Sequence, residues 1–405
     1  MRKQTILASI DVGTTKVCTT IAEVNSGDVL RVAGVGITPS NGLHKGLVVN
    51  IRDARESIRE SVKKAEQASG YKVESAYVGV TGRHVSSLNN RGVVAITRND
   101  RLVRSDDLKR VLQCAQSVKV PSDRKLLHVI PRNYAVDGQI GVKNPVGMHG
   151  FRLDVETHVI TAAVTSVQNL VKCIRGIGID IDDLILEPLA SSEAVLTEDE
   201  KQVGIILADI GGGTTDIAVF KDGSIWHTAI LPVAGYQLTR DVAIGLGLPF
   251  DVAEEMKKRY GSAMPVYEGQ TETASAIAED GHGASYQDLC DILRARVEEI
   301  IRLILLEMPR SDYETLVPAG LVLTGGSSNL SGIDVLGREI LRLPVRVGTP
   351  TSINGITDVL RNPAYATSVG LLLWGAKHQD TQDWKFRGFG ASVRRLVFRI
   401  KDLFR

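Results

Sequence analysis

Residues 205–220 read IILADIGGGTTDIAVF, and residues 6–24 read ILASIDVGTTKVCTTIAEV. In both stretches an apolar run ends in an aspartate, is followed by glycine and threonine, and returns as a second apolar run. This pattern predicts two strands joined by a tight turn in each stretch. Asp11 and Asp209 lie 198 residues apart, which is the size of a domain. We therefore expect two α/β halves related by duplication.

The composition of the two turns suits phosphate binding. Glycine lets the backbone approach an anion closely and present successive N–H groups, and threonine hydroxyls add further donors. An aspartate at the end of a strand can hold Mg²⁺, usually through water. Two such turns facing each other would clamp a polyphosphate from both sides. The alternative is a pair of ordinary glycine-threonine hairpins, and the matched second copy argues against it.

Other nucleotide-binding motifs are missing from the sequence, which has no GxxxxGK[ST] and no GxGxxG after a strand. Three further segments suit a nucleotide cleft. They are the strand and glycine turn at 321–327, a helix with Glu254 and Lys257 on one face, and Glu187 at the start of another helix. Taken singly, each is also explained as ordinary structure, such as a surface ion pair.

The composition is that of a globular protein with a basic tail. Of its 405 residues, 43% are hydrophobic and 23% are charged, and the net charge is +1. No apolar run reaches the roughly 18 residues of a membrane span, and we see no signal peptide. The four cysteines are far apart, so we expect a reducing compartment without disulfides or zinc. Residues 384–405 carry seven basic side chains against one acid, which leaves a slightly acidic body unsuited to nucleic acid.

Both turns, together with segments 187–192 and 323–327, resemble the nucleotide motifs of the actin and heat-shock-chaperone ATPase superfamily. Within it, the chain resembles the FtsA family of bacterial cell-division proteins over almost its whole length. This second resemblance rests on LLHVIPRNYAVDG (126–138), KNPVGM (143–148), LASSEAVLTEDE (189–200) and IGGGTTDIAV (210–219). The implied fold is α/β, an actin-like ATPase fold with two duplicated halves around a nucleotide cleft, an inserted α+β subdomain and a C-terminal amphipathic helix.

The resemblance implies ATP and Mg as cofactors and gives roles to residues of the cleft. Asp11 and Asp209 would face the magnesium, and Glu187 is the candidate for ordering the attacking water. Because the family hydrolyses ATP poorly, ATP binding is a firmer expectation than turnover. The implied nucleotide-binding residues are Gly13, Thr14, Thr15, Lys16, Gly211, Gly212, Gly213, Thr214, Thr215, Gly235, Glu254, Lys257, Gly325, Gly326 and Ser327.

The same resemblance divides the chain into subdomains. Segment 84–165 would interrupt the first half as an inserted subdomain (1C) for self-association and later division proteins. We expect in it a helix from Ser105 to Val118 with Ser105 as N-cap, and strands at 92–97, 126–136 and 155–164. The remaining expected segments are 1–83 and 166–200 (1A), 201–230 and 313–376 (2A), 231–312 (2B), a linker at 377–390 and a membrane-targeting helix at 391–405.

Residues 287–308 have the apolar period of a helix. In the family this helix belongs to the 2B subdomain, which receives the C-terminal peptide of FtsZ. The resemblance assigns that contact to Arg294 and Arg296. The alternative is that both arginines are merely solvated.

The last fifteen residues, ASVRRLVFRIKDLFR, form a basic amphipathic pattern. Such a helix on a tether is typical of an in-plane anchor for an anionic membrane surface. The alternatives are docking on the protein's own body, a groove in a partner, or a disordered basic tail. The expected membrane residues are Val393, Arg394, Arg395, Leu396, Val397, Arg399, Ile400, Lys401, Leu403 and Phe404.

Together these features predict a peripheral protein of the cytoplasmic membrane face at the division site. It would bind ATP, assemble with itself into an actin-like filament and tether FtsZ filaments. Two alternatives have the same fold: a chaperone- or kinase-type ATPase enzyme, and a pilus-assembly adaptor resembling PilM. An enzyme would need a substrate site, for which we find no set of residues, and a PilM-like protein should lack the basic tail.

Overall fold

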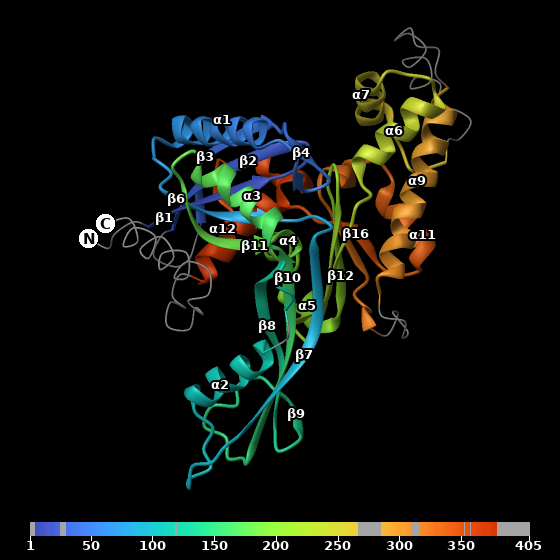
Figure 1. Cartoon of the computed structure of the whole chain (residues 1–405). Helices are drawn as coiled ribbons and strands as arrows, with labels where there is room; N and C mark the ends of the chain where they lie inside the picture. The colour runs from blue at the N-terminus through green and yellow to red at the C-terminus, as the bar shows by residue number, and fades with distance from the viewer. Residues whose placement is uncertain are drawn as a thin grey trace.

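The two quoted stretches form matching antiparallel hairpins at the centres of two different sheets. A computed structural model describes residues 5–24, 30–117, 120–265, 285–308, 316–351, 353–356 and 358–378 (Figure 1). Within these residues the chain forms two α/β halves and a third, separate sheet. The duplication read from the sequence is thus confirmed as an actin-like arrangement of two sheets.

The first half contains a six-stranded sheet in the order β11-β6-β1-β2-β3-β17. Helices α1 (Ile51–Ser69) and α3 (Val164–Arg175) bury apolar side chains against one of its faces. A small hairpin of β4 (Leu43–His44) and β5 (Leu47–Val48) lies beside the sheet. The strands are β1 (Thr5–Val12), β2 (Lys16–Val24), β3 (Leu30–Pro39), β6 (Ser75–Val80), β11 (Asp180–Leu186) and β17 (Asn354–Gly355).

The second half contains a five-stranded sheet in the order β14-β13-β12-β15-β16. Its strands are β12 (Ile205–Ile210), β13 (Thr215–Lys221), β14 (Ser224–Leu231), β15 (Leu321–Thr324) and β16 (Val345–Val347). The helices of this half are α5 (Glu198–Val203), α6 (Gly235–Gly245), α7 (Phe250–Tyr260), α9 (Tyr286–Leu306) and α11 (Ile333–Leu341), with short 3₁₀ turns η1 (Gly326–Asn329), η2 (Val359–Arg361) and η3 (Pro363–Tyr365).

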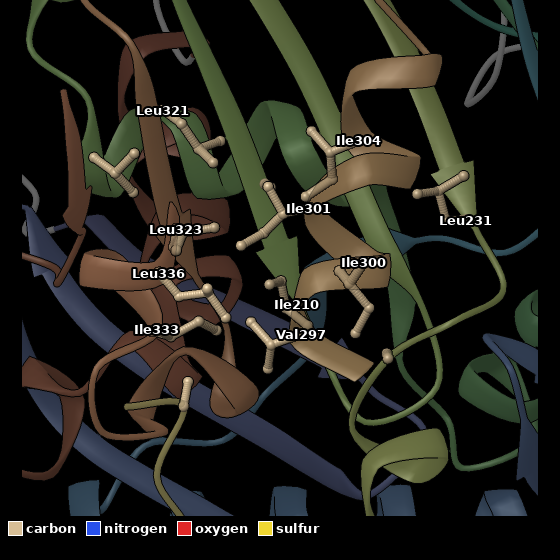
Figure 2. Close-up of a cluster of buried hydrophobic side chains, with 14 of the residues drawn as sticks. Ile210, Leu231, Val297, Ile300, Ile301, Ile304, Leu321, Leu323, Ile333 and Leu336 are labelled. Carbon is tan, nitrogen blue, oxygen red and sulfur yellow. The ribbon is translucent and has the colours of Figure 1, made fainter. Parts of the chain in front are cut away.

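The core of the second half confirms the helical period read from the sequence. Helix α9 was expected at 287–308 and is observed at Tyr286–Leu306. Figure 2 shows Val297, Ile300, Ile301 and Ile304 of this helix turned toward the sheet, where they join Leu323 and other buried residues. A buried apolar stripe of this kind is what fixes a helix on a sheet.

Two helices lie between the halves. Helix α4 (Glu187–Val195) follows β11 and packs on β12 and β13, and α12 (Ala366–His378) packs on α4, β1 and β2. One buried cluster therefore contains residues of both sheets, including Leu7 and Ile185 from the first and Leu207 from the second. This shared core holds the two halves together beneath the hairpins.

The inserted segment forms an antiparallel sheet of its own, in the order β7-β10-β8-β9 (Figure 1). Its strands are β7 (Val85–Ala95), β8 (Arg124–Val136), β9 (Gln139–Val142) and β10 (Arg152–Ala163). They cover the strand expected at 126–136 and all but the last residues of those expected at 92–97 and 155–164. Helix α2 (Ser105–Gln116) packs on β7 and β10. Ser87 of β7 donates a 2.9 Å hydrogen bond to the carbonyl of Thr228, so the insert also contacts the second half.

One expectation about the insert is wrong: Ser105 is the first helical residue of α2, and Arg104 is the N-cap. The reason is the buried side chain of Asp107, which accepts the backbone N–H of Arg104 at 2.9 Å. The same carboxylate pairs with Arg98 and Arg110. This anchored aspartate, not the serine hydroxyl, satisfies the start of the helix.

All four cysteines are free. In the part of the chain that the structure describes, no helix is long and apolar enough to cross a membrane. The expected linker and amphipathic helix fall almost entirely at 379–405, which lies outside the described residues.

Candidate functional site

A cleft of about 490 Å³ lies between the two halves and is lined by both hairpin turns. Residues of the first turn, of the second turn and of the loop after β15 face the same space. Its lining residues are Asp11, Gly13, Thr14, Thr15, Lys16, Thr81, Glu187, Asp209, Gly211, Gly212, Gly213, Thr214, Asp216, Lys258, Gly325, Gly326, Asn329, Asn362, Ala364, Tyr365 and Thr367.

The two turns have the same backbone geometry. The N–H of Gly13 donates to the carbonyl of Lys16 at 3.0 Å, and the N–H of Gly211 donates to that of Thr214 at 2.9 Å. These glycines occupy equivalent positions, two residues after Asp11 and Asp209. The repeat in the sequence is therefore a repeat of the turn itself.

The two turns also touch each other. A Cβ atom added at Gly212 would stand 2.3 Å from Cγ2 of Thr15, and one added at Gly213 would stand 2.5 Å from Oγ1 of Thr14. Only glycine allows this approach, because real Cβ contacts do not fall below about 3 Å. Backbone N–H groups and threonine hydroxyls of both turns thus come together at one place in the cleft.

The aspartates that end β1 and β12 are buried and held by hydroxyls. Asp11 accepts a 2.7 Å hydrogen bond from Ser368. Asp209 accepts bonds of 2.6 Å from Ser191 and 3.0 Å from Thr367. Burial raises the pKa of Asp209 despite these two hydrogen bonds.

Glu187 completes a group of acids around the cleft. It lies at the N-terminus of α4, directly after β11, and is 7% exposed. Burial, with repulsion by Asp11, Asp216 and Asp209, raises its pKa well above the ordinary value. Burial likewise raises the pKa of Asp216 to about 8. Among the described residues, Oε1 of Glu187 has no hydrogen-bond partner.

Lys16 is the cation of the first turn. Its Nζ lies 4.0 Å from Oδ2 of Asp11 and 5.1 Å from the centre of the Tyr365 ring. Burial alone would lower the pKa of Lys16, but attraction by Asp11, Cys18 and Asp209 raises it. Two lysines, Lys16 and Lys258, against four buried carboxyl groups leave the cleft acidic, which favours a bound cation.

These features fit a nucleotide accompanied by Mg²⁺. The glycine and threonine donors suit phosphate, and the surplus of carboxyl groups suits a hydrated cation. Within the described residues, no three acidic, histidine or cysteine side chains form a direct metal site.

The residues expected near adenosine divide into two groups. Gly325 and Gly326 line the cleft directly. Ser327 and Gly235 instead brace the second turn, because the Ser327 hydroxyl and the Gly235 N–H both donate to the carbonyl of Gly211, at 2.8 and 3.1 Å. Thr215 likewise lies behind its turn, donating to the carbonyl of Val233.

Glu254 and Lys257 lie on one face of α7 and pair with each other at 2.6 Å, and neither is among the residues that line the cleft. Lys257 also donates to Thr239 at 2.8 Å and to the carbonyl of Gly235 at 3.4 Å. Its side chain is 13% exposed, and these two hydrogen bonds tie it to the first residues of α6. The neighbouring Lys258 lines the cleft instead.

Several lining residues were missed by sequence reasoning. Asp216 closes the quoted second motif and was given no role, although its position in that motif was a usable signal. Lys258 adjoins a predicted residue. The others, Thr81, Asn329, Asn362, Ala364, Tyr365 and Thr367, lie in segments whose local patterns do not indicate a nucleotide site.

The two arginines of α9 lie in different surroundings. Arg294 pairs with Glu339 at 2.8 Å and donates to the carbonyl of Ala263. Arg296 pairs with Asp241 and Glu299. Only Arg296 lines a groove of about 360 Å³ between α6 and α9, together with Asp241, Ile244, Gly245, Ile292, Ala295 and Glu299.

Two family profiles match the chain. The profile described as "Cell division protein FtsA" matches residues 206–370, and the one described as "SHS2 domain inserted in FTSA" matches residues 82–161. The second match covers the separate sheet β7-β10-β8-β9 almost completely.

Several curated relatives carry the name Cell division protein FtsA. The one from Pseudomonas aeruginosa is 46% identical over 93% of this chain and 90% of its own length. The one from Escherichia coli is 34% identical over 99% of this chain and 97% of its own length. The one from Bacillus subtilis is 36% identical over 95% and 87%.

Solved structures with low sequence identity share the fold. The PilM-PilN type IV pilus biogenesis complex matches with a TM-score of 0.63 and 16% identity, over 91% of this chain and 98% of that chain. MreB5 of Spiroplasma citri bound to ADP matches with a TM-score of 0.52 and 14% identity, over 93% and 96%. These likenesses concern the fold alone, which the PilM and MreB structures share with this chain.

Proposed function

Because the chain belongs to the FtsA family of cell-division proteins, we propose that it binds ATP, assembles on the inner face of the cell membrane and tethers FtsZ filaments there. The main observation in support of nucleotide binding is the contact between the two matched turns. Groups of both halves that can donate hydrogen bonds to phosphate meet beside the buried acids of the cleft. The MreB5 structure, which shares the fold, is bound to ADP, and this supports the proposal that the chain binds a nucleotide.

In this proposal Gly13, Thr14, Thr15 and Gly211 to Thr214 hold the phosphates, with Lys16 as counter-charge. Gly325 and Gly326 lie beside the adenosine. Magnesium, when bound, would neutralise phosphate charge through its water shell beside Asp11 and Asp209. Ser327, Gly235, Thr215 and the Glu254–Lys257 pair act indirectly, by holding the second turn and the start of α6.

Glu187 is the residue that would order an attacking water. Its carboxyl group faces the cleft from the start of α4, and its raised pKa disfavours the ionised form. A raised pKa makes the carboxyl group less available as a base, so we propose slow turnover at most. ATP binding, rather than hydrolysis, would then support folding and assembly.

The groove at Arg296 is the proposed site for the C-terminal peptide of FtsZ. It combines apolar side chains, such as Ile244, which is 70% exposed, with the charge of Arg296. Arg294 faces Glu339 instead, outside this groove. Arg296→Ala should therefore weaken binding of an FtsZ C-terminal peptide about tenfold or more, and Arg294→Ala much less. Equal effects of the two substitutions would place the peptide elsewhere.

The remaining assignments follow the family. We propose that the segment 84–165 is an interaction subdomain for self-association and for later division proteins. The separate sheet and the match at 82–161 support a distinct unit there. We propose the boundaries given above for 1A, 2A and 2B.

Residues 391–405 are the proposed membrane anchor, on the strength of their basic amphipathic pattern. One such helix binds a bilayer marginally. A filament presents many helices together, and avidity then strengthens binding without any new contact. Membrane attachment would thus depend on assembly, and assembly on ATP.

Co-sedimentation with anionic vesicles tests this mechanism. Full-length protein and a truncation ending at Asp380 would be compared with and without ATP, and with zwitterionic vesicles as a control. We expect only the full-length protein to sediment with anionic vesicles, and more so with ATP. Equal behaviour of the two proteins would refute the tether and leave a nucleotide-binding member of the family with another use for its tail.

A chaperone- or kinase-type enzyme is the remaining alternative. It predicts ATP turnover of the order of 1 s⁻¹ or faster. A steady-state hydrolysis assay at saturating ATP distinguishes it from the slow turnover proposed here. The likeness to the PilM-PilN complex does not favour a pilus function, because it extends to the fold alone.

A further inference from the structure

Besides the cleft, Glu187 lines a second, small cavity of about 20 Å³. It is bounded by the end of β6, the hairpin β4–β5 and the start of α3. Glu187 and His84 both line it, together with Thr81 and Ser166. A volume of this size accommodates one water molecule, since one water needs roughly 10–15 Å³ by this kind of measure.

Both titratable residues of this cavity have unsatisfied polar atoms. Within the described part of the chain, Oε1 of Glu187 and both ring nitrogens of His84 are shielded from solvent and without a hydrogen-bond partner. Buried polar atoms are nearly always hydrogen-bonded, if not to protein then to ordered water. One water molecule in this cavity would pair with Oε1 of Glu187 and with one of the two ring nitrogens of His84.

The backbone around the cavity holds these groups in place. A Cβ atom at Gly79 would stand 3.2 Å from Oε1 of Glu187, and one at Gly82 would stand 2.9 Å from Nδ1 of His84. Burial, with repulsion by Arg124, lowers the pKa of His84 to about 4. A neutral imidazole has one donor and one acceptor nitrogen, so it can share a water molecule with a carboxyl group in either protonation state.

We propose that this cavity holds an ordered water molecule that bridges His84 and Glu187, which makes His84 a positioning residue for Glu187. Glu187 faces the nucleotide cleft as well as this cavity. The water holds the carboxyl group of Glu187 in one orientation. The consequence for hydrolysis rests on the proposed function, whereas the water site itself does not.

Crystal structures of the full chain with Mg²⁺ and a non-hydrolysable ATP analogue test the proposal. In the wild type we expect a water molecule within about 3.2 Å of both His84 and Glu187. In His84→Phe this water should be absent and the Glu187 carboxyl group displaced. His84→Asn, which keeps a polar group, should restore both. A dry cavity in the wild type, or an unmoved Glu187 in His84→Phe, would overturn the proposal.

Binding and single-turnover hydrolysis provide the second readout. His84→Phe should bind the analogue within about twofold of the wild type but hydrolyse ATP several-fold more slowly, with partial recovery in His84→Asn. Exposed His149→Phe is the matched control and should change neither quantity. Equal hydrolysis by the wild type and His84→Phe would contradict the positioning role. If the wild type bound no nucleotide, the proposed function would fail, while crystals without nucleotide would still decide the water site.

Discussion

The hydroxyl of Ser368 donates a 2.7 Å hydrogen bond to Oδ2 of Asp11, 357 residues earlier in the chain. The preceding residue, Thr367, donates to Asp209 of the other half at 3.0 Å. Two neighbouring side chains in the first turn of α12 therefore hold both aspartates of the duplicated turns. Helix α12 thus fixes the acidic groups of the two halves relative to each other.

Removing the Ser368 hydroxyl should destabilise the protein. Ser368→Ala leaves the buried carboxylate of Asp11 with one hydrogen bond fewer, which costs about 1–3 kcal/mol in the free energy of unfolding. Urea denaturation measures this change. Ser40→Ala is the matched control, because the buried Ser40 hydroxyl makes no hydrogen bond within the described residues. Equal costs for the two substitutions would show that the bond to Asp11 contributes nothing.

Filling the space between the two turns should weaken nucleotide binding. Gly212→Ala places a methyl group 2.3 Å from Cγ2 of Thr15 and forces the turns apart. We expect at least a tenfold loss in ATP affinity, measured by titration calorimetry, and about 1–3 kcal/mol of destabilisation.

The double variant Gly212→Ala/Thr15→Ser tests whether the clash with the Thr15 methyl group causes the loss of ATP affinity, because serine keeps the hydroxyl and removes that methyl group. It should recover part of the affinity, and Thr15→Ser alone should bind nearly as the wild type does. Unchanged affinity in Gly212→Ala would mean that the approach of the turns is not needed for binding.

Much of the fold was readable from local patterns. The two hairpins followed from apolar runs around Asp11 and Asp209, and α9 followed from its helical period, which its tertiary packing then reinforced. The start of α2 was misplaced by one residue because a buried aspartate, and not the serine hydroxyl, satisfies the helix end. The roles of Thr367 and Ser368 could not be foreseen. A hydrogen bond between residues 357 positions apart cannot be predicted from a local sequence pattern.

Substituting Lys257 should mainly lower stability, and substituting its neighbour Lys258 should mainly weaken ATP binding. Lys257 is largely buried and binds Glu254, Thr239 and the Gly235 carbonyl, so Lys257→Met should cost about 1–3 kcal/mol of stability. Lys258 is largely exposed, pairs with Glu254 at 3.0 Å and lines the cleft. Lys258→Met should change stability by less than about 1 kcal/mol and weaken ATP binding. Denaturation and ATP titration of both variants check this, and the reverse ranking of stabilities would refute the assignment.

Protonation of His158 should destabilise the contact between the inserted sheet and the second half. Its ring pairs with Asn89 Oδ1 at 2.7 Å and with the Thr228 hydroxyl at 2.9 Å. Asn89 donates its amide N–H to the carbonyl of Trp226, which leaves Oδ1 to accept from Nδ1. Nε2 is then the acceptor for Thr228, and a second proton on the ring would force the Thr228 hydroxyl to turn and accept instead. The neutral ring is therefore the form that fits this junction.

Burial, with repulsion from His227 and Arg132, lowers the pKa of His158 from 6.5 to about 3. Between these values the unfolded chain binds a proton at His158 that the folded chain does not bind. Stability should therefore fall as the pH drops below about 6.5, by about 1.4 kcal/mol per pH unit from this residue. His158→Gln should reduce the slope of unfolding free energy against pH between about 6 and 4 by that amount, whatever its cost at neutral pH. His149→Gln controls for the substitution, and an unchanged slope in His158→Gln would mean that the ring is already charged in the folded protein.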